Sequence, residues 1–172
     1  YARYLDLQEG VLRRRLRWSV PDGTVVDLSF ERFASLADEH ALALRVEATP
    51  VDRDADIRVR ALLDSHVENE GFVHWNVVSQ QSASPSGAAE AGGAAAEATL
   101  LVETRHSKKQ LAVSTRLQGD GVTLPEQGVD CSGAPGIVLE TRRQAGEALK
   151  LHKLVAVYTC LLYTSPSPRD RT

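Results

Sequence analysis

The sequence predicts an all-β protein, an antiparallel β-sandwich, on three observations. Apolar side chains recur at every second residue, which is the period of a strand. Turn signals rich in glycine, proline and aspartate separate these runs every 8–15 residues. No stretch of the chain sustains the 3.6-residue period of a helix. The eight or nine strands counted in this way have the spacing that is typical of a sandwich.

The first two predicted strands form a hairpin. In residues 11–18 apolar side chains alternate with arginines, and residues 25–30 repeat the alternation. Pro21-Asp22-Gly23 lies between them, where proline fixes φ and glycine accepts a positive φ. The apolar residues that share one face of their strand are Leu12, Leu16 and Trp18 in the first strand and Val26, Leu28 and Phe30 in the second.

Later runs continue the same pattern. Strands are predicted at residues 42–48, 57–63, 111–117, 137–142 and 149–158, with turns at 50–55, 118–121 and 145–147. Ser35-Leu36-Ala37-Asp38 is predicted to cap one helical turn before the chain returns to a strand. Val155, Val157 and Tyr158 are expected at an unpaired sheet edge, which favours aggregation.

Residues 80–98 interrupt the strand pattern. They are rich in Ser, Ala, Gly and Glu and contain no large apolar side chain. Such a segment buries too little surface to offset the entropy of ordering it. We therefore predict a flexible loop at 80–98, inside one partial domain that spans residues 1–159.

Composition restricts the classes of partner. The chain is 42% hydrophobic and 25% charged, as expected for a globular protein. A net charge of −3 argues against a nucleic-acid partner, because such domains carry a basic surface. No apolar run approaches the roughly 20 residues of a membrane-spanning helix, so no membrane partner is predicted.

The two ends of the sequence are unusual. The chain contains no methionine, so we expect that translation does not begin at Tyr1. Residues 160–172 resemble one reading frame of a mosaic-end sequencing adapter, and we set them aside as an adapter-derived tail. Without Cys160, Cys131 is the one remaining cysteine, which allows no internal disulfide and fits a cytoplasmic location.

One polar cluster is a candidate for a catalytic or metal site. Glu68 and Glu70, with His66 and His74 nearby, have the residue types of an acid–base pair or a metal site. A solvated polar loop accounts for them better, because the spacing matches no established motif. We predict no catalytic residue and no metal ligand here.

Two further candidates were rejected. Asp52, Asp54 and Asp56 alternate as in a calcium loop but lack the required glycine and distal glutamate. Cys131 lies in a Gly/Pro turn without an identifiable base to activate it.

Two features have both a functional and a structural interpretation. His74 and Trp75 are candidates for substrate binding, because an exposed indole stacks on the apolar face of a sugar; core packing is the alternative. The arginines at positions 13, 14, 15 and 17 indicate either an anionic partner or a polar outer face of a strand.

Several segments resemble, in the same order, the N-terminal domain of glycoside hydrolase family 65. Residues 31–42 resemble its R-x-x-S-x-x-D-x-H stretch, and residues 153–159 resemble its K-x-V-A-x-Y-T strand. The other matching segments are residues 3–14, 21–23, 44–50 and 63–69. The resemblance covers most of residues 3–159.

The resemblance implies a parent enzyme much longer than this chain. Family members are inverting phosphorylases, and some hydrolases, that act on α-glucosidic disaccharides such as maltose, trehalose and kojibiose. They carry an N-terminal super-β-sandwich, a helical linker, an (α/α)6 barrel with the catalytic glutamate, and a small C-terminal sheet.

By this resemblance, the chain is a non-catalytic fragment, truncated at both ends, whose partners are the linker and barrel of the same polypeptide. The parent is expected to be a cytoplasmic homodimer that uses a disaccharide and phosphate, without cofactor or metal, and releases β-glucose 1-phosphate. The alternative is a free-standing carbohydrate-binding sandwich.

Overall fold

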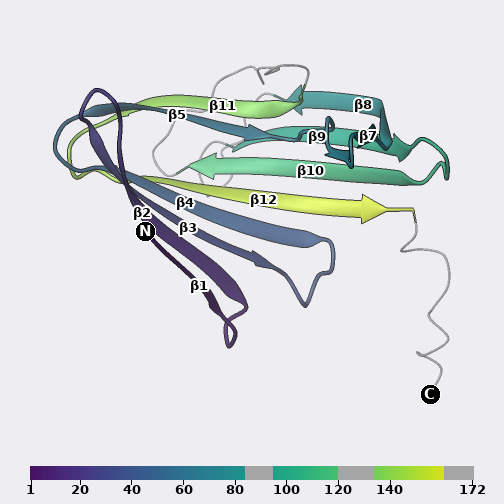
Figure 1. Ribbon diagram of the computed structural model, residues 1–172, viewed down its shortest axis with the longest axis horizontal. Coiled ribbons are helices and arrows are strands. Elements are labelled where there is room, and N and C mark those ends of the chain that lie inside the picture. Colours follow the sequence, from purple (N-terminus) through teal and green to yellow (C-terminus); the bar gives the residue numbers. More distant parts are fainter. Residues whose placement is uncertain (84–94, 120–133, 161–172) are drawn as a thin grey trace.

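The computed structural model describes residues 1–83, 95–119 and 134–160, and every regular element in these residues is a strand (Figure 1). The strands are β1 (Ala2–Asp6), β2 (Val11–Ser19), β3 (Val25–Ala34), β4 (Ala41–Pro50), β5 (Ala55–Leu62), β6 (Glu68–Asn69), β7 (Phe72–Val73), β8 (Trp75–Ala83), β9 (Ala95–Thr104), β10 (Gln110–Gly119), β11 (Gly136–Arg143) and β12 (Leu149–Thr159). All their pairings are antiparallel, which confirms the predicted fold class. None of the described residues forms a helix long and apolar enough to cross a membrane.

Eight strands form one large sheet in the order β1-β2-β3-β4-β12-β10-β9-β8. β5 and β11 pair as a second, two-stranded sheet, and β11 contacts β8 and β9 of the large sheet (Figure 1). We call the face of the large sheet that packs on β5 and β11 the inner face; it carries the buried Ala98, Leu117 and Leu151. The opposite face is the outer face.

The hydrophobic core lies between the inner face and the β5–β11 pair. Ile137 and Leu139 of β11 are fully buried, and Leu151 of β12 is 1% exposed. The alternation that predicted these strands arises because one face of each packs in this core while the other meets water.

The loop predicted over residues 80–98 is shorter than expected. β8 continues to Ala83 and β9 begins at Ala95. Ala96 and Ala98 are only 2% and 1% exposed, within the same buried cluster as Ile137 of β11. The prediction treated a run without large apolar residues as unable to enter a core, whereas small side chains fill a core when the opposing strand supplies the bulk. Residues 84–94 lie outside the described residues.

The β2–β3 hairpin confirms the predicted turn. Gly23 has a φ of 87°, a conformation that glycine adopts without steric cost. The carboxylate of Asp22 accepts a hydrogen bond from the Thr24 N–H at 2.8 Å, and the Val20 N–H donates to the Thr24 carbonyl oxygen at 2.8 Å. The proline–aspartate–glycine signal therefore fixes the turn through one backbone conformation and one side-chain acceptor.

β12 lies inside the large sheet, so the prediction of an unpaired edge at Val155, Val157 and Tyr158 was wrong. It pairs with β4 on one side and with β10 on the other. The prediction assumed that the last strand of the chain would be the last strand of the sheet. Among the described residues, the outermost strands of this sheet are β1 and β8.

The pairing of β12 with β10 continues one residue past the strand. The Cys160 N–H donates to the Gln110 carbonyl oxygen at 3.3 Å, and the Gln110 N–H lies 3.4 Å from the Cys160 Sγ. Cys160 therefore contacts the fold, although it belongs to the segment that was set aside as an adapter-derived tail. Residues 161–172 lie outside the described residues.

Candidate functional site

The segment between β3 and β4 is a hydrogen-bonded turn and not the helical turn predicted for it. Ser35 Oγ accepts a hydrogen bond from the Asp38 N–H at 3.0 Å, and Asp38 Oδ1 accepts one from the His40 N–H at 2.9 Å. The Ser35 N–H donates to the Ala41 carbonyl oxygen at 2.9 Å and closes the turn. Ser and Asp favour such local hydrogen bonds outside helices as well as at helix caps.

This turn contacts the C-terminal end of β12 through a ring stack and hydrogen bonds. The rings of His40 and Tyr158 stack with their centroids 4.1 Å apart. His40 Nδ1 lies 2.8 Å from the Val157 carbonyl oxygen, so Nδ1 carries the hydrogen because a carbonyl only accepts. The Val157 N–H in turn donates to the His40 carbonyl oxygen at 2.9 Å. Two sequence segments that carry the family resemblance, 31–42 and 153–159, thus contact each other.

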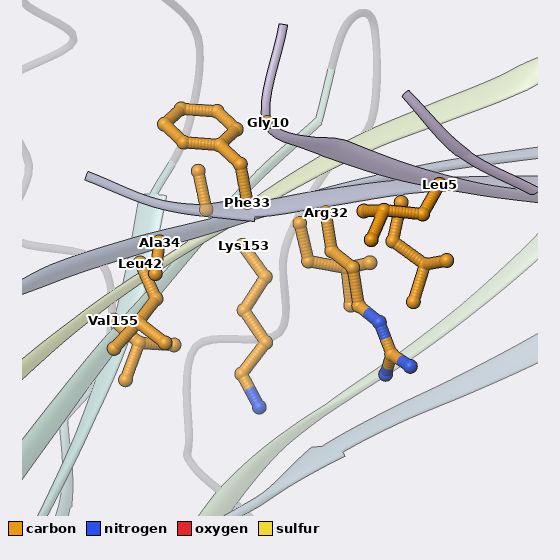
Figure 2. Close-up of a pocket in the computed structure, with 11 residues that line it drawn as sticks. Leu5, Gly10, Arg32, Phe33, Ala34, Leu42, Lys153 and Val155 are labelled. Atoms are coloured by element: carbon orange, nitrogen blue, oxygen red, sulfur yellow. The ribbon is translucent and has the colours of Figure 1, made fainter. Parts of the chain in front are cut away.

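An apolar hollow of about 410 Å³ lies on the inner face where β1–β4 and β12 run side by side (Figure 2). Figure 2 shows the side chains of Arg32 and Lys153 on the same side of the sheet as Leu5, with Phe33 pointing to the other side. No residue of β5 or β11 lines the hollow. The apolar walls come mainly from Leu5, Leu12, Leu42, Leu44 and Val155.

The hollow is positively charged as well as apolar. Arg32 and Lys153 line it, and no aspartate or glutamate does. Lys153 is half-buried, and burial lowers the pKa of its ammonium group, with no carboxylate counteracting the effect. The sequence offered a signal for both residues, since each is a cation at a position where the alternation calls for an apolar side chain.

The outer face has the opposite character, because Arg13, Arg17 and Arg45 on it have carboxylate partners within the chain. Arg13 Nη1 lies 3.1 Å from Asp6 Oδ2, and Arg13 Nε lies 3.0 Å from Glu31 Oε1. Arg17 Nε and Nη2 each donate a hydrogen bond of 2.7 Å to one carboxylate oxygen of Asp27. This pairing lowers the pKa of Asp27. For Arg13 and Arg17 these contacts favour the interpretation of a polar strand face.

The acidic and histidine candidates are not gathered into one site. Glu68 and Glu70 are exposed on the β6–β7 hairpin. His66 Nδ1 lies 3.4 Å from the Asp64 carboxylate instead. Within residues 1–83, 95–119 and 134–160, no group of three or more His, Cys, Asp or Glu side chains could hold a metal ion.

Asp52 and Asp54, in the turn before β5, accept hydrogen bonds from two different backbone N–H groups. Asp52 Oδ1 accepts from the Val25 N–H at 3.0 Å, and Asp54 Oδ1 accepts from the Ala145 N–H at 3.2 Å. They therefore join neighbouring turns and do not converge on one point. Cys131 lies outside the described residues.

Trp75 and His74, the two candidates for sugar contact, occupy different environments. Trp75 is half-buried and packs against the core cluster. His74 is exposed, and its carbonyl oxygen accepts a hydrogen bond from the Arg105 N–H at 2.9 Å. The nearby Phe72 is 68% exposed. Sugar contact at Trp75 and His74 stays a prediction.

Comparison with known protein families extends over nearly the whole chain. Residues 1–171 match the family model described as "Glycosyl hydrolase family 65, N-terminal domain". A solved structure described as "Putative kojibiose phosphorylase from human microbiome" superimposes with a TM-score of 0.72 and 19% sequence identity. The superposition covers 98% of this chain and 20% of that one. At this identity the likeness shows the fold alone.

Curated relatives align with the chain over part of their length. The α,α-trehalose phosphorylase of Thermoanaerobacter brockii is 22% identical over 184 residues, which cover 92% of this chain and 21% of the relative. The kojibiose phosphorylase of Halothermothrix orenii is 32% identical over 75 residues, which cover 44% of this chain and 10% of the relative. The chain thus spans about a fifth of the trehalose phosphorylase and a smaller share of the kojibiose phosphorylase.

Proposed function

Because this chain belongs to the family of glycosyl hydrolase family 65 N-terminal domains, we propose that it is the non-catalytic N-terminal domain of an α-glucoside phosphorylase. The observation that carries the proposal is the family match over residues 1–171. Relatives named as kojibiose and trehalose phosphorylases favour phosphorolysis over hydrolysis. The substrate is accordingly a disaccharide of the kojibiose, trehalose or maltose type.

In the proposed reaction of the parent enzyme, a carboxylic acid protonates the glycosidic oxygen as phosphate attacks the anomeric carbon from the opposite face. The glycosidic bond breaks, the leaving sugar takes the proton, and β-glucose 1-phosphate forms with inverted configuration. Phosphate takes the place of the water that an inverting hydrolase must activate with a second carboxylate. One protein carboxylate is therefore sufficient, and the proposal places it outside this chain.

The proposed partners of the domain are the helical linker and the (α/α)6 barrel of the same polypeptide. The proposed parent is a cytoplasmic homodimer that needs no metal or cofactor. For this domain the proposal requires surfaces that hold other parts of the polypeptide, and the uncovered apolar hollow between β1–β4 and β12 is the candidate that supports it.

The test is to recover the gene from its source DNA and to express the polypeptide that it encodes. This polypeptide is assayed with kojibiose, trehalose and maltose, each in the presence of inorganic phosphate, and β-glucose 1-phosphate is measured. We expect release from one disaccharide, and no release from the purified 172-residue chain alone.

Three results would overturn the assignment in different ways. Release of glucose 1-phosphate by the 172-residue chain alone would show that the chain itself is catalytic. Consumption of a disaccharide without phosphate would make the parent a hydrolase. A gene that encodes no catalytic domain would favour the free-standing carbohydrate-binding module.

A further inference from the structure

Charged side chains are segregated between the two faces of β1–β4 and β12. Arg3 is the cross-strand partner of Arg14, and Arg32 lies opposite Leu44, which lies opposite Lys153. Directly opposed residues of neighbouring strands point to the same face of a sheet. Lys153 also opposes the buried Leu117, which places the Arg32 row on the inner face.

The row that contains Arg14 lies on the same face. Arg14 opposes Phe30, Phe30 opposes Val46, and Val46 opposes the buried Leu151. The inner face of these five strands therefore carries four cations, which we call the inner-face cation patch: Arg3, Arg14, Arg32 and Lys153.

All the carboxylates of the same five strands point the other way. They alternate with the inner-face positions along each strand and form ion pairs with outer-face arginines. These carboxylates are Asp6, Asp27, Glu31 and Glu47. Random placement of charges on a solvated sheet would mix the two signs on both faces, whereas here one face is mixed and the other is purely cationic.

Aromatic or apolar groups lie beside three members of the inner-face cation patch. The Arg14 guanidinium lies 5.3 Å from the ring centre of Tyr1 and 5.9 Å from that of Phe30, within the range of cation–π attraction. Arg32 and Lys153 stand in the apolar hollow. Aromatic rings therefore lie beside Arg14 and apolar side chains beside Arg32 and Lys153, and within residues 1–83, 95–119 and 134–160 none of the four cations forms an ion pair.

The chemistry of this face defines what would cover it. A purely apolar cover would remove water from these cations without offering a replacement partner, which is unfavourable. A second copy packed face to face would bring the same cations against each other, which is repulsive. A favourable cover supplies carboxylates together with apolar side chains.

We propose that the inner-face cation patch is a docking site for an acidic, apolar polypeptide surface from the part of the parent enzyme beyond this chain. The inference rests on the proposed function, because the trehalose phosphorylase relative extends far beyond the aligned region, which is 21% of its length. Arg32 and Lys153 flank Leu44 on three adjacent strands, so they stand two strand spacings apart, about 10 Å. A matching partner surface carries two carboxylates about 10 Å apart, to face Arg32 and Lys153, with an apolar residue between them to face Leu44.

A synthetic helix can reproduce this pattern as a binding probe. Two glutamates about seven residues apart on one helix face are separated by about 10 Å, with leucines placed between them. The peptide is compared with two versions in which glutamine or lysine replaces both glutamates. Fluorescence anisotropy of each labelled peptide is measured against the 172-residue chain at about 50 mM and about 500 mM NaCl.

We expect the glutamate peptide to bind at least about tenfold more tightly than the glutamine peptide, and to weaken with salt. The double variant Arg32→Glu/Lys153→Glu should no longer bind the glutamate peptide and should bind the lysine peptide instead. The matched outer-face variant Arg15→Glu/Lys150→Glu should bind as the unaltered chain does. If charge reversal unfolds the chain, Arg32→Gln/Lys153→Gln gives the same loss without the gain.

Three results would overturn the proposal. The three peptides could bind equally, or the outer-face variant could lose as much binding as the inner-face variant. Sedimentation could also show a self-association that Arg32→Glu abolishes, which would make a second copy the occupant. None of these measurements depends on phosphorolysis, so the docking site and the proposed function fail separately.

Discussion

The imidazole of His40 and the phenol ring of Tyr158 stack with an angle of only 15° between their planes, although they come from distant parts of the sequence. His40 follows the turn that Ser35 and Asp38 stabilise, and Tyr158 lies near the end of β12. Each of the two segments supplies one half of the contact. The contact therefore joins the two segments that carry the family resemblance, residues 31–42 and 153–159.

His40→Ala should destabilise the chain by about 1–2 kcal/mol, because it removes the ring stack and the hydrogen bond to Val157. Urea unfolding followed by circular dichroism measures the change. Glu39→Ala is the control, since the Glu39 side chain is 72% exposed and should contribute less than about 0.5 kcal/mol. A double-mutant cycle with Tyr158→Ala should show a coupling of about 0.5–1.5 kcal/mol. Additive effects would contradict the stack.

Gly136→Ala should destabilise the β5–β11 pair by overpacking. A Cβ at this position would lie 2.8 Å from the Ala61 carbonyl oxygen and closer still to the Leu62 side chain. Such crowding typically costs about 1–3 kcal/mol. Gly146→Ala separates this effect from backbone strain, because Gly146 has a φ of 81° but open space around it. Its expected cost is about 1 kcal/mol, and an equal or larger loss for Gly146→Ala in thermal unfolding would contradict the crowding.

Strand periodicity was sufficient to predict most of the large sheet. Each half-buried antiparallel strand repeats its apolar side chains at every second residue, and Pro21-Asp22-Gly23 marks a hairpin locally. The position of β12 between β4 and β10 was not predicted, because pairing between distant strands leaves no local signal. The start of β9, with Ala96 and Ala98, was missed for a similar reason, since the large side chains that bury it come from β11.

The candidate site depends on the same long-range pairing. Arg32 and Lys153 lie in distant parts of the chain and come together only because β12 inserts beside β4. Sequence alone showed two isolated cations in apolar positions. It could not show that both belong to one face, or that this face lacks carboxylates.

Lys153→Met should stabilise the isolated chain at neutral pH by about 0.5–2 kcal/mol, because it replaces a half-buried charge with an apolar side chain. Burial lowers the pKa of Lys153 in the folded state. At any pH below this lowered pKa, Lys153 is charged in both states, and the folded state carries the full cost of burying the charge. This cost disappears as pH rises from the lowered pKa toward the unfolded value. The advantage of Lys153→Met should therefore narrow in alkaline solution.

Chemical denaturation at pH 7 and at alkaline pH measures the effect of Lys153→Met. Lys150→Met on the exposed outer face is the matched control, with an expected change within about 0.5 kcal/mol. A gain that does not depend on pH would refute the assignment to the Lys153 charge. A loss of stability would show that the ammonium group has a favourable partner.

Asp52→Asn should reduce the loss of melting temperature that occurs as pH falls through the acidic range. The hydrogen bond from the Val25 N–H is the main cause that lowers the pKa of Asp52. Stability from this carboxylate is present above its unfolded pKa of about 4 and is lost as pH falls through the lowered value. Melting temperatures across the acidic range should therefore converge between the variant and the unaltered chain at the lowest pH. Asp56→Asn, at an 81% exposed side chain, should leave the curve unchanged.

Deletion of residues 161–172 should leave the melting temperature unchanged within about 1 °C, as expected for an adapter-derived tail. A longer deletion that also removes residues 157–160 should lower it by several degrees, because it removes the contacts of His40 with Val157 and Tyr158. Calorimetry of both truncated chains makes the comparison. A marked loss from the shorter deletion would show that the tail contributes to the fold.

The internal position of β12 also sets the order of events during synthesis. Until residues 149–159 leave the ribosome, β4 and β10 present unpaired edges, because the strand that joins them has not been made. The nascent chain therefore holds two half-sheets that are exposed to pairing with other chains. Closure waits for a contact between distant parts of the chain, which is the kind of contact that slows folding. A chaperone that shields these edges would act between the synthesis of β4 and that of β12.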